Sequence, residues 1–249
     1  MSQTVERAVA IIEQISDRPA SLAEVAERLG VHKSTALRLL QTLERAGFAR
    51  RGEGGRYSVG TRLIGIATKA LDSLDLREIA RPHLSRLNQD CGHTIHLASL
   101  LDGDIVYIDK YEGNTSVRMY SRIGKTASPH ASGVGKAILC HLDPSQLDAI
   151  LRTLTYVQHT ASTIISETAL RGELAAVRER GYARDDGEFE DIINCVAAPI
   201  RSSDGRVQSA ISISAPKMVT PLAELELLVP DLLTTATAIS HDYGWSGAS

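Results

Sequence analysis

Residues 21–59 read SLAEVAERLGVHKSTALRLLQTLERAGFARRGEGGRYSV, and this stretch decides the fold of the N-terminal part of the chain. Ser21 and Glu24 match a capping box, which predicts a short helix over residues 22–29 that a glycine ends. Apolar side chains recurring at helical spacing predict a second helix over residues 33–46. Two helices joined by a short glycine-containing turn form a helix-turn-helix.

The flanking segments complete this unit. Residues 4–16 carry apolar side chains at helical spacing and predict a first helix, which residues 17–20 interrupt with a proline. Residues 48–51 and 56–59 read as two short strands around a glycine-rich turn, which is a β-hairpin. Three helices followed by such a hairpin predict a winged helix-turn-helix domain over residues 1–60.

The polar face of the second helix points to a nucleic-acid partner. The chain has a net charge of −3, yet residues 32–62 hold seven Lys or Arg and only two acidic residues. A basic patch on an acidic protein favours a polyanion, although a solvated basic surface would look the same. Long polar side chains on one helix face can reach phosphates and base edges in a major groove of double-stranded DNA. The predicted DNA-contacting residues are Ser21, His32, Lys33, Ser34, Thr35, Arg38, Gln41, Arg45, Arg50, Arg51 and Arg56.

Composition sets limits on the compartment. No run of 18 apolar residues predicts a membrane span, and the first ten residues lack the apolar core of a signal peptide. Three scattered cysteines do not make a disulfide framework. We therefore expect a cytoplasmic protein with reduced cysteines and no membrane partner.

The larger C-terminal part reads as an α+β domain over residues 76–249, joined through a linker helix at 61–75. The linker is apolar and could pack against another subunit or against its own winged helix. Beyond it, hairpins alternate with helices, which predicts an antiparallel sheet. The predicted elements are helix 75–90 with a kink or break at Pro82, hairpin 94–101/104–110, strand 116–123, helices 132–141, from 144, and 167–180, strand 182–185, hairpin 195–202/206–215 and a last helix from 221 to about 243.

Five segments of this domain resemble the IclR family of bacterial regulators. They are SVRMYSRIG at 116–124, HASGVGKA at 130–137, GYARDDGEFE at 181–190, CVAAPI at 195–200 and SISAP at 212–216. The resemblance implies a GAF-like effector domain that binds a small metabolite, and homodimers, often paired into tetramers, on palindromic operators. Carried over by position, the effector pocket falls on Met119, Gly133, Val134, Asp185, Ile193, Cys195, Ser212 and Ser214; we add His130, which precedes the predicted helix start.

Local chemistry fits an anion at this site. Ser212 and Ser214 lie two apart on a strand, so their hydroxyls share one face. Free N–H groups at a helix start favour an anion, and Gly133 and Gly135 would let a carboxylate approach the backbone. We expect Lys136 to face solvent, although it could instead add positive charge to the site.

The roles of three other residues near this site can also be considered from the sequence. We expect Cys195 to be a small apolar side chain in the wall of the pocket. Asp185 could orient a ligand hydroxyl or merely cap a turn. Asn194 is expected to face away from the pocket on its alternating strand.

The effector class follows from composition. With two Phe and one Trp in the chain, a small polar acid, sugar-derived or a keto acid, is the hypothesis, and an aromatic acid sensed by an activator is the alternative. Repression is the default because members of the resembled family more often repress.

The sequence also bears on two other functional classes, an enzyme and a metal sensor. An enzyme is not expected, because no nucleophile elbow, phosphate loop or dinucleotide fingerprint occurs. A metal sensor could use Cys91, His93 and His96, but a fourth ligand is lacking and the two histidines would lie on opposite strand faces. No cofactor is predicted.

Overall fold

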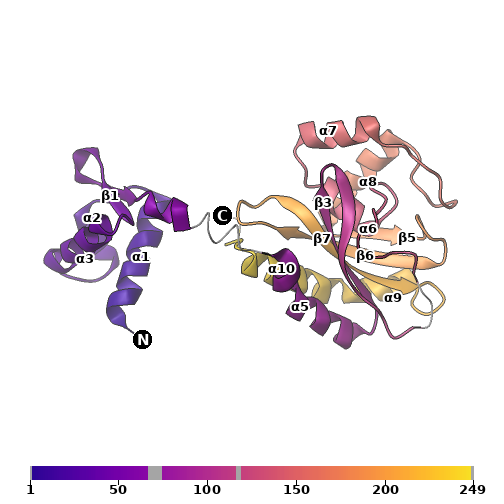
Figure 1. Cartoon of the computed structure of the whole chain (residues 1–249), viewed down its shortest axis with the longest axis horizontal. Helices are drawn as coiled ribbons and strands as arrows, with labels where there is room; N and C mark the ends of the chain where they lie inside the picture. Colours follow the sequence, from indigo (N-terminus) through magenta and orange to yellow (C-terminus); the bar gives the residue numbers. More distant parts are fainter. Residues whose placement is uncertain (1, 67–74, 116–118, 248–249) are drawn as a thin grey trace. The chain divides into compact units, whose positions relative to one another are not determined.

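The computed structural model describes residues 2–66, 75–115 and 119–247. Contacts divide the chain into two compact units, residues 1–74 and 75–249, which are described separately (Figure 1). Among the described residues, no helix is long and apolar enough to cross a membrane.

Over residues 2–59, unit 1 has three α-helices and a two-stranded hairpin, as predicted, with a 3₁₀ turn at Glu53–Gly55 between the strands. Apolar side chains from all of these elements, among them Ile11, Val25, Leu40 and Tyr57, form one core. The hairpin strands pair antiparallel, and Ala20 adds a single bridge to Tyr57. The elements are α1 (Gln3–Asp17), α2 (Leu22–Arg28), α3 (Lys33–Arg45), β1 (Ala49–Arg51) and β2 (Tyr57–Val59).

The predicted linker helix begins where the hairpin ends. Residues 62–66 are helical, and the rest of the predicted 61–73 helix, from residue 67, lies outside the described residues. The Arg62 N–H donates to the Gly47 carbonyl at 3.2 Å, and the Arg62 guanidinium lies 5.8 Å from the centre of the Phe48 ring. The start of the linker therefore packs on its own winged helix.

Unit 2 is built on a five-stranded antiparallel sheet with strand order β4-β3-β7-β6-β5. The fold class is α+β, as predicted. The strands are β3 (Thr94–Leu101), β4 (Asp104–Tyr111), β5 (Ala183–Asp186), β6 (Ile193–Arg201) and β7 (Val207–Pro216).

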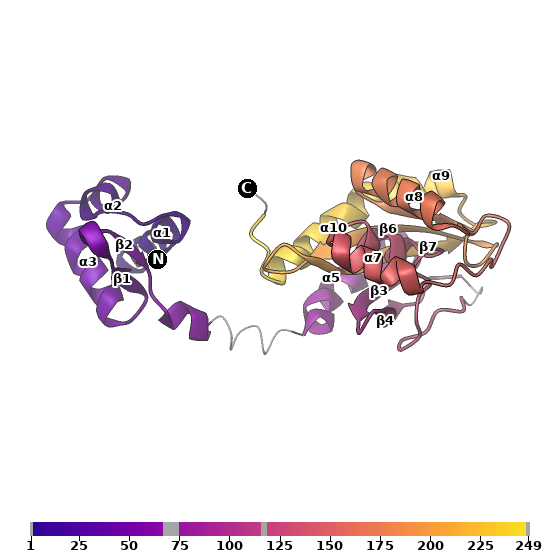
Figure 2. The ribbon, with the colours of Figure 1, turned by 90° about the horizontal axis from the view of Figure 1, so that it is seen from above.

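Helices cover both faces of the sheet (Figures 1 and 2). On one face lie α5 (Leu76–Cys91), α9 (Leu222–Leu225) and α10 (Val229–Asp242), and on the other α6 (Gly133–Leu139), α7 (Pro144–Thr153) and α8 (Glu167–Arg180). Because strand side chains alternate between faces, Ile211 and Ile213 fill the α5/α10 core, whereas Ser212 and Ser214 face α6. Two buried layers result, and Ser212 and Ser214 lie in the layer next to α6.

Three predicted elements differ from the structure. Helix α5 continues through Pro82, since Leu76, Ala80 and Leu84 on its apolar side are buried on both sides of the proline. The final helix is divided into α9, a 3₁₀ turn and α10, which has a proline in its first turn. The strand predicted at 116–123 is wrong over 119–123, and 116–118 lie outside the described residues.

Candidate functional site

The outer face of α3 is polar and exposed. Lys33, Ser34, Arg38, Gln41 and Arg45 are exposed, whereas Ala36, Leu40 and Leu43 of the same helix are buried. Neither the Arg38 guanidinium nor the Gln41 amide makes a side-chain bond within the described part of the chain, while Arg45 Nε donates to the Gln41 carbonyl at 3.4 Å. This face therefore keeps donor groups free for a partner.

The start of α3 is capped by an unusual residue. His32 is the N-cap, and its Nδ1 accepts from the Ser34 N–H at 3.4 Å and lies 2.9 Å from Ser34 Oγ. His32 is exposed, and Thr35, half-buried, completes this first turn. Ser21 has a different role, because its Oγ accepts from the Glu24 N–H at the start of α2. The predicted capping box is confirmed.

The three hairpin arginines are used differently. Arg50 Nε donates to Ser58 Oγ at 3.0 Å, and Arg51 lies over the Tyr57 ring at 5.8 Å. Arg56 instead donates to the Pro19 carbonyl at 2.7 Å and pairs with Glu24 at 3.0 Å. Bonds from the Ser21 backbone and hydroxyl, followed by the one from Arg56, lower the Glu24 pKa to about 2. Arg56 thus fastens the hairpin to α2, but its side chain is 44% exposed and its contact with DNA backbone stays a prediction.

A small pocket in unit 2 gathers most of the predicted effector residues. It lies between the start of α6 and strands β5, β6 and β7, and its cavity volume is about 40 Å³, room for a few water molecules. Eight predicted residues line it: Met119, Gly133, Val134, Asp185, Ile193, Cys195, Ser212 and Ser214. Six further lining residues were missed: His96, Tyr107, Ser121, Ser132, Phe189 and Glu190.

His130 does not belong to this pocket. Its imidazole lies within hydrogen-bond distance of Ser128 Oγ (3.2 Å) and of the Val157 carbonyl (3.1 Å), on the outer side of the 128–132 turn. The prediction was wrong because the His130 ring is held by Ser128 and Val157 and lines a second hollow, whereas Ser132 lines the pocket.

His96 is the centre of a hydroxyl network in the pocket. Its Nε2 lies 2.7 Å from Ser121 Oγ, and its Nδ1 lies 3.3 Å from Ser212 Oγ and 3.4 Å from Ser214 Oγ. Burial, followed by the nearby Lys110 ammonium, lowers the His96 pKa to about 3. The imidazole is therefore neutral at physiological pH, which suits an Nε2–H tautomer that accepts from the two β7 serines.

Two carboxylates also line the pocket. Asp185 is almost fully buried, and its Oδ1 accepts from the Glu188 N–H at 2.7 Å. Burial and the neighbouring Glu188 carboxylate raise the Asp185 pKa to about 7. Glu190 Oε1 accepts from the Tyr120 N–H at 3.2 Å. Asp185 thus caps the turn after β5 and also lines the cavity, and its role in orienting a ligand hydroxyl stays a prediction.

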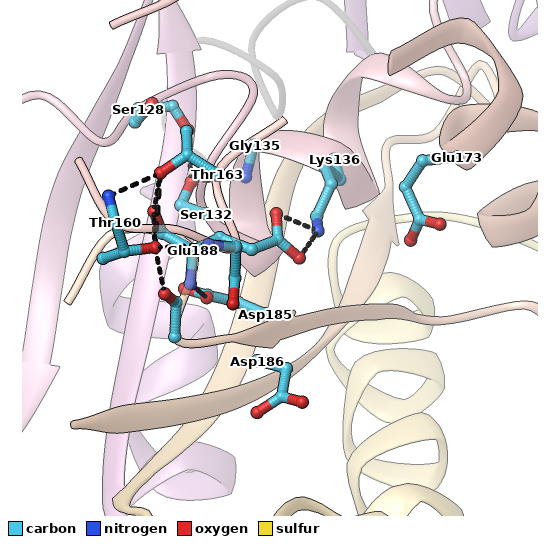
Figure 3. A network of polar contacts seen from close by, with 12 residues as sticks. Ser128, Ser132, Gly135, Lys136, Thr160, Thr163, Glu173, Asp185, Asp186 and Glu188 are labelled. Atoms are coloured by element: carbon cyan, nitrogen blue, oxygen red, sulfur yellow. Dashed lines mark hydrogen bonds and ion pairs between the residues drawn. The ribbon is translucent and has the colours of Figure 1, made fainter. Parts of the chain in front are cut away.

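Lys136 does not face solvent. Its side chain is fully buried, and Nζ donates to both carboxylate oxygens of Glu188 at 2.5 and 2.6 Å (Figure 3). The expectation failed because Glu188 lies 52 residues along the chain and reaches α6 only through the fold. Thr163 Oγ1 donates to the Glu188 carbonyl at 2.6 Å, so the segment after β5 is held from two sides.

Three further residues that the sequence singled out, Cys195, Asn194 and Cys91, are explained by burial or by a hydrogen bond. Burial raises the Cys195 pKa to about 12, so its thiol remains protonated and forms an apolar wall. Asn194 faces away from the pocket, as expected, and its Nδ2 donates to the Thr220 carbonyl at 3.0 Å. Cys91 ends α5, where its Sγ accepts from the His93 N–H at 3.5 Å. No metal-binding group of three or more His, Cys, Asp or Glu occurs among the described residues.

Two glycines at the start of α6 are explained by packing. A Cβ on Gly133 would lie 2.8 Å from Cys195 Sγ, and one on Gly135 would lie 2.7 Å from the carbonyl oxygens of Ser128 and Pro129. Their small size therefore brings α6 close to β6 and to the preceding turn, and the approach of a carboxylate to this backbone stays a prediction.

Gly133→Ala is expected to destabilise unit 2 by about 1–3 kcal/mol, because the added methyl must displace Cys195 in a close-packed layer. Chemical denaturation followed by circular dichroism measures this change. Gly172→Ala is the matched control, since no atom lies near that Cβ and alanine favours the helix by about 0.5–1 kcal/mol. Equal stability of the two variants would contradict the packing explanation.

Two family models match the chain and together span nearly all of it. Residues 4–53 match the IclR helix-turn-helix domain, and residues 68–241 match the C-terminal domain of the bacterial transcriptional regulator IclR. The chain belongs to the IclR family. Its relatives are named as transcriptional regulators, so the IclR-family assignment makes this protein a transcriptional regulator and not an enzyme.

Full-length relatives support the same assignment. The HTH-type transcriptional regulator XynR of Escherichia coli is 34% identical over 246 residues, covering 98% of each chain. The acetate operon repressor of Salmonella typhimurium is 35% identical over 219 residues, covering 86% of this chain and 80% of the relative.

Solved IclR-family structures share the fold. The Thermotoga maritima IclR structure matches with a TM-score of 0.66 at 32% identity, covering 97% of this chain and 99% of that one. The Agobacterium tumefaciens repressor BlcR matches with a TM-score of 0.83 at 27% identity, covering 98% of each chain. IclR-family regulators bind DNA through the helix-turn-helix and an effector through the C-terminal domain, which assigns these roles to units 1 and 2.

Proposed function

We propose that this protein is a cytoplasmic repressor that binds a palindromic operator as a homodimer or a pair of dimers, and that a small organic acid in the unit 2 pocket alters this binding. The observation that carries the DNA-binding part is the exposed polar face of α3, with Arg38 and Gln41 free of side-chain partners among the described residues. Exposed donors on the second helix of a helix-turn-helix are placed to contact base edges.

The helix-turn-helix pair sets the geometry of the complex. Two units of a dimer would place α3 in successive major grooves, with half-site centres roughly 34 Å apart or a multiple of that. Lys33, Ser34 and Thr35 at the start of α3 would fix the helix on the site, whereas Arg50 and Arg51 on the hairpin would contact phosphates. Because phosphate contacts release counterions, operator affinity should fall steeply with salt.

Arg38→Ala is expected to weaken operator binding by about 1–3 kcal/mol, because a bidentate base contact supplies this much discrimination. Electrophoretic shifts with DNA from upstream of the gene measure the change. Arg86→Ala is the matched control, since this arginine lies in unit 2 with an 85% exposed side chain. An unchanged shift with Arg38→Ala would remove Arg38 from the contact surface.

The pocket suits a small ligand rich in oxygen atoms. Hydroxyl groups of Ser121, Ser212, Ser214 and Tyr107 surround the neutral His96, and Asp185 can carry a proton near neutral pH. Among the described residues, no Lys or Arg lines the cavity. A carboxylate would instead bind the hydroxyls and the N–H groups of Gly133 and Val134, which lack i−4 partners at the start of α6. A sugar acid or a keto acid fits this set.

Ligand binding requires the lining side chains to move. The present cavity of about 40 Å³ is smaller than a sugar acid needs. Such a movement gives the ligand different affinities for two states of the protein, and the size of any switch is limited by that difference.

Calorimetric titration with D-gluconate, pyruvate and benzoate tests this proposal. Binding of gluconate or pyruvate that is lost in Ser212→Ala/Ser214→Ala supports it. Binding of benzoate alone in this pocket would refute the polar-acid effector. A reporter gene behind the operator, with and without the bound acid, shows whether the protein represses.

A further inference from the structure

A second, larger hollow lies beside the effector pocket in unit 2. Its volume is about 720 Å³, within the range of small-molecule sites. It is lined by the turn 124–130, by the end of α7 with residues 153–159, and by Phe189. Figure 1 labels α7, the end of which lines this hollow. We call it the ring groove, because of the side chains described next.

Aromatic side chains form one continuous wall of the ring groove. The His130 and His159 rings stack with centroids 6.0 Å apart, and the Phe189 ring meets His159 edge-on at 4.7 Å. Tyr120 lies next to Phe189 with centroids 6.4 Å apart. Tyr120 is 63% exposed and Val157 49% exposed, so the wall presents apolar area to solvent. Aromatic rings attract one another in tilted or edge-on geometry, so a ligand with an aromatic ring can add to this row of ring contacts.

The Lys125 ammonium lies at the edge of this aromatic wall. Lys125 Nζ lies 3.5 Å from the centre of the Tyr120 ring, and it has no carboxylate partner among the described residues. The one acidic residue that lines the groove is Asp104, which makes no ion pair with Lys125 in the described part of the chain. An ammonium already positioned on a ring face is available to an anion that also contacts the ring.

His130 and His159 differ in whether their ring nitrogens already have hydrogen-bond partners. His130 uses both ring nitrogens, at 3.2 Å from Ser128 Oγ and 3.1 Å from the Val157 carbonyl. Burial lowers the His130 pKa, so it is a neutral, fixed platform. The His159 imidazole is exposed, and its ring nitrogens have no hydrogen-bond partner among the described residues. Lys125 and His159 therefore supply the polar contacts that the wall does not use internally.

We propose that the ring groove binds a small aromatic carboxylate, with its ring against Phe189 and His159 and its carboxylate on Lys125. The wall selects a flat ring, and the single unpaired ammonium selects one negative charge. The effector pocket has the opposite character, because hydroxyls and carboxylates line it and, within the part of the chain that the structure describes, no lysine or arginine does. The two sites would therefore take different acids.

Variants must separate the two sites. Phe189 lines both hollows, and Tyr120 lies between Met119 and Ser121, which line the pocket. These residues are unsuitable for the test. Lys125 and His159 line only the ring groove, whereas Ser214 lines only the pocket. Lys125→Gln and His159→Ala are therefore the test variants, and Ser214→Ala is the control.

The experiment titrates benzoate into the full-length protein and its variants, followed by calorimetry and by saturation-transfer NMR. Cyclohexanecarboxylate, which lacks the aromatic ring, and benzyl alcohol, which lacks the charge, serve as comparison ligands. Benzoate should bind more tightly than either, and Lys125→Gln and His159→Ala should each weaken it by about fivefold or more. Ser214→Ala should leave benzoate binding unchanged, and thermal unfolding checks that each variant is folded.

Three results would overturn the proposal. One is no benzoate binding up to about 10 mM, the weak end of specific small-molecule affinity. Another is benzoate binding that Ser214→Ala abolishes, which would place the ligand in the effector pocket. The third is a loss of self-association in Lys125→Gln by sedimentation with benzoate binding unchanged, which would make this face a contact between copies of the chain.

Discussion

Lys136→Met is expected to lower the free energy of unfolding by about 3–5 kcal/mol, because it leaves the Glu188 carboxylate buried without its cation. Lys136 is fully buried and Glu188 is 12% exposed in this pair. Methionine fills the space of the lysine stem, so the loss reports the charge and not a cavity. Urea denaturation at pH 7.5 followed by far-ultraviolet circular dichroism measures the difference.

Two further variants test whether the unpaired Glu188 charge causes this loss of stability. Arg171→Met removes two exposed ion pairs, with Asp148 and Glu167, and should cost less than about 1 kcal/mol. Lys136→Met/Glu188→Gln removes both charges and should recover most of the lost stability. Burial already raises the Glu188 pKa, so Glu188 in the single variant should take up a proton, and its defect should shrink as pH falls toward 5. A defect in Lys136→Met no larger than that of Arg171→Met would contradict the buried pair.

Asp185→Asn is expected to stabilise unit 2 by about 4 kcal/mol at pH 8 and by less, about 2 kcal/mol, at pH 5. Burial and Glu188 raise the Asp185 pKa from 3.8 to about 7. Between these two values the folded protein binds a proton that the unfolded chain has released, so wild-type stability falls as pH rises through this range. Asparagine has no charge to bury, and its carbonyl oxygen can still accept from the Glu188 N–H.

The measurement compares denaturation midpoints of the wild type and Asp185→Asn at pH 5 and pH 8. Other charged groups near Asp185 are Glu188, Lys136, Lys217 and Glu190, and they are the same in both proteins. Asp186→Asn is the matched control, because its carboxylate is 61% exposed and its pair with Lys217 lies at the surface. That variant should stay within about 0.5 kcal/mol of the wild type at both pH values. If Asp185→Asn were no more stable than the wild type at pH 8, the carboxylate would not be destabilised as described.

The fold of unit 1 could be predicted because its signals are local. The capping box of Ser21 and Glu24, the glycines after the helices and the apolar spacing of α3 act within a few residues. Helical hydrogen bonds join positions four apart, so a periodic pattern specifies both the helix and its buried face. The exposure of Arg38 and Gln41 followed directly from that period.

The pocket could be predicted only in part. Eight of its residues were carried over by position from the resembled family, and the shared face of Ser212 and Ser214 follows from strand alternation alone. The missed residue His96 lies on β3, opposite Ser212 in the β3–β7 ladder. No spacing in the sequence joins positions 96 and 212, since strand order is set by how the sheet closes over its core.

By itself, the sequence determined the winged helix-turn-helix, the α+β class of unit 2 and the segments around the pocket, because capping, turns and periodicity depend on neighbours along the chain. Only the tertiary structure decided that Lys136 pairs with Glu188, that Arg56 is bound to Glu24 and that His130 faces the ring groove. Burial and charge pairing depend on which distant segments meet, and packing rather than local pattern decides this.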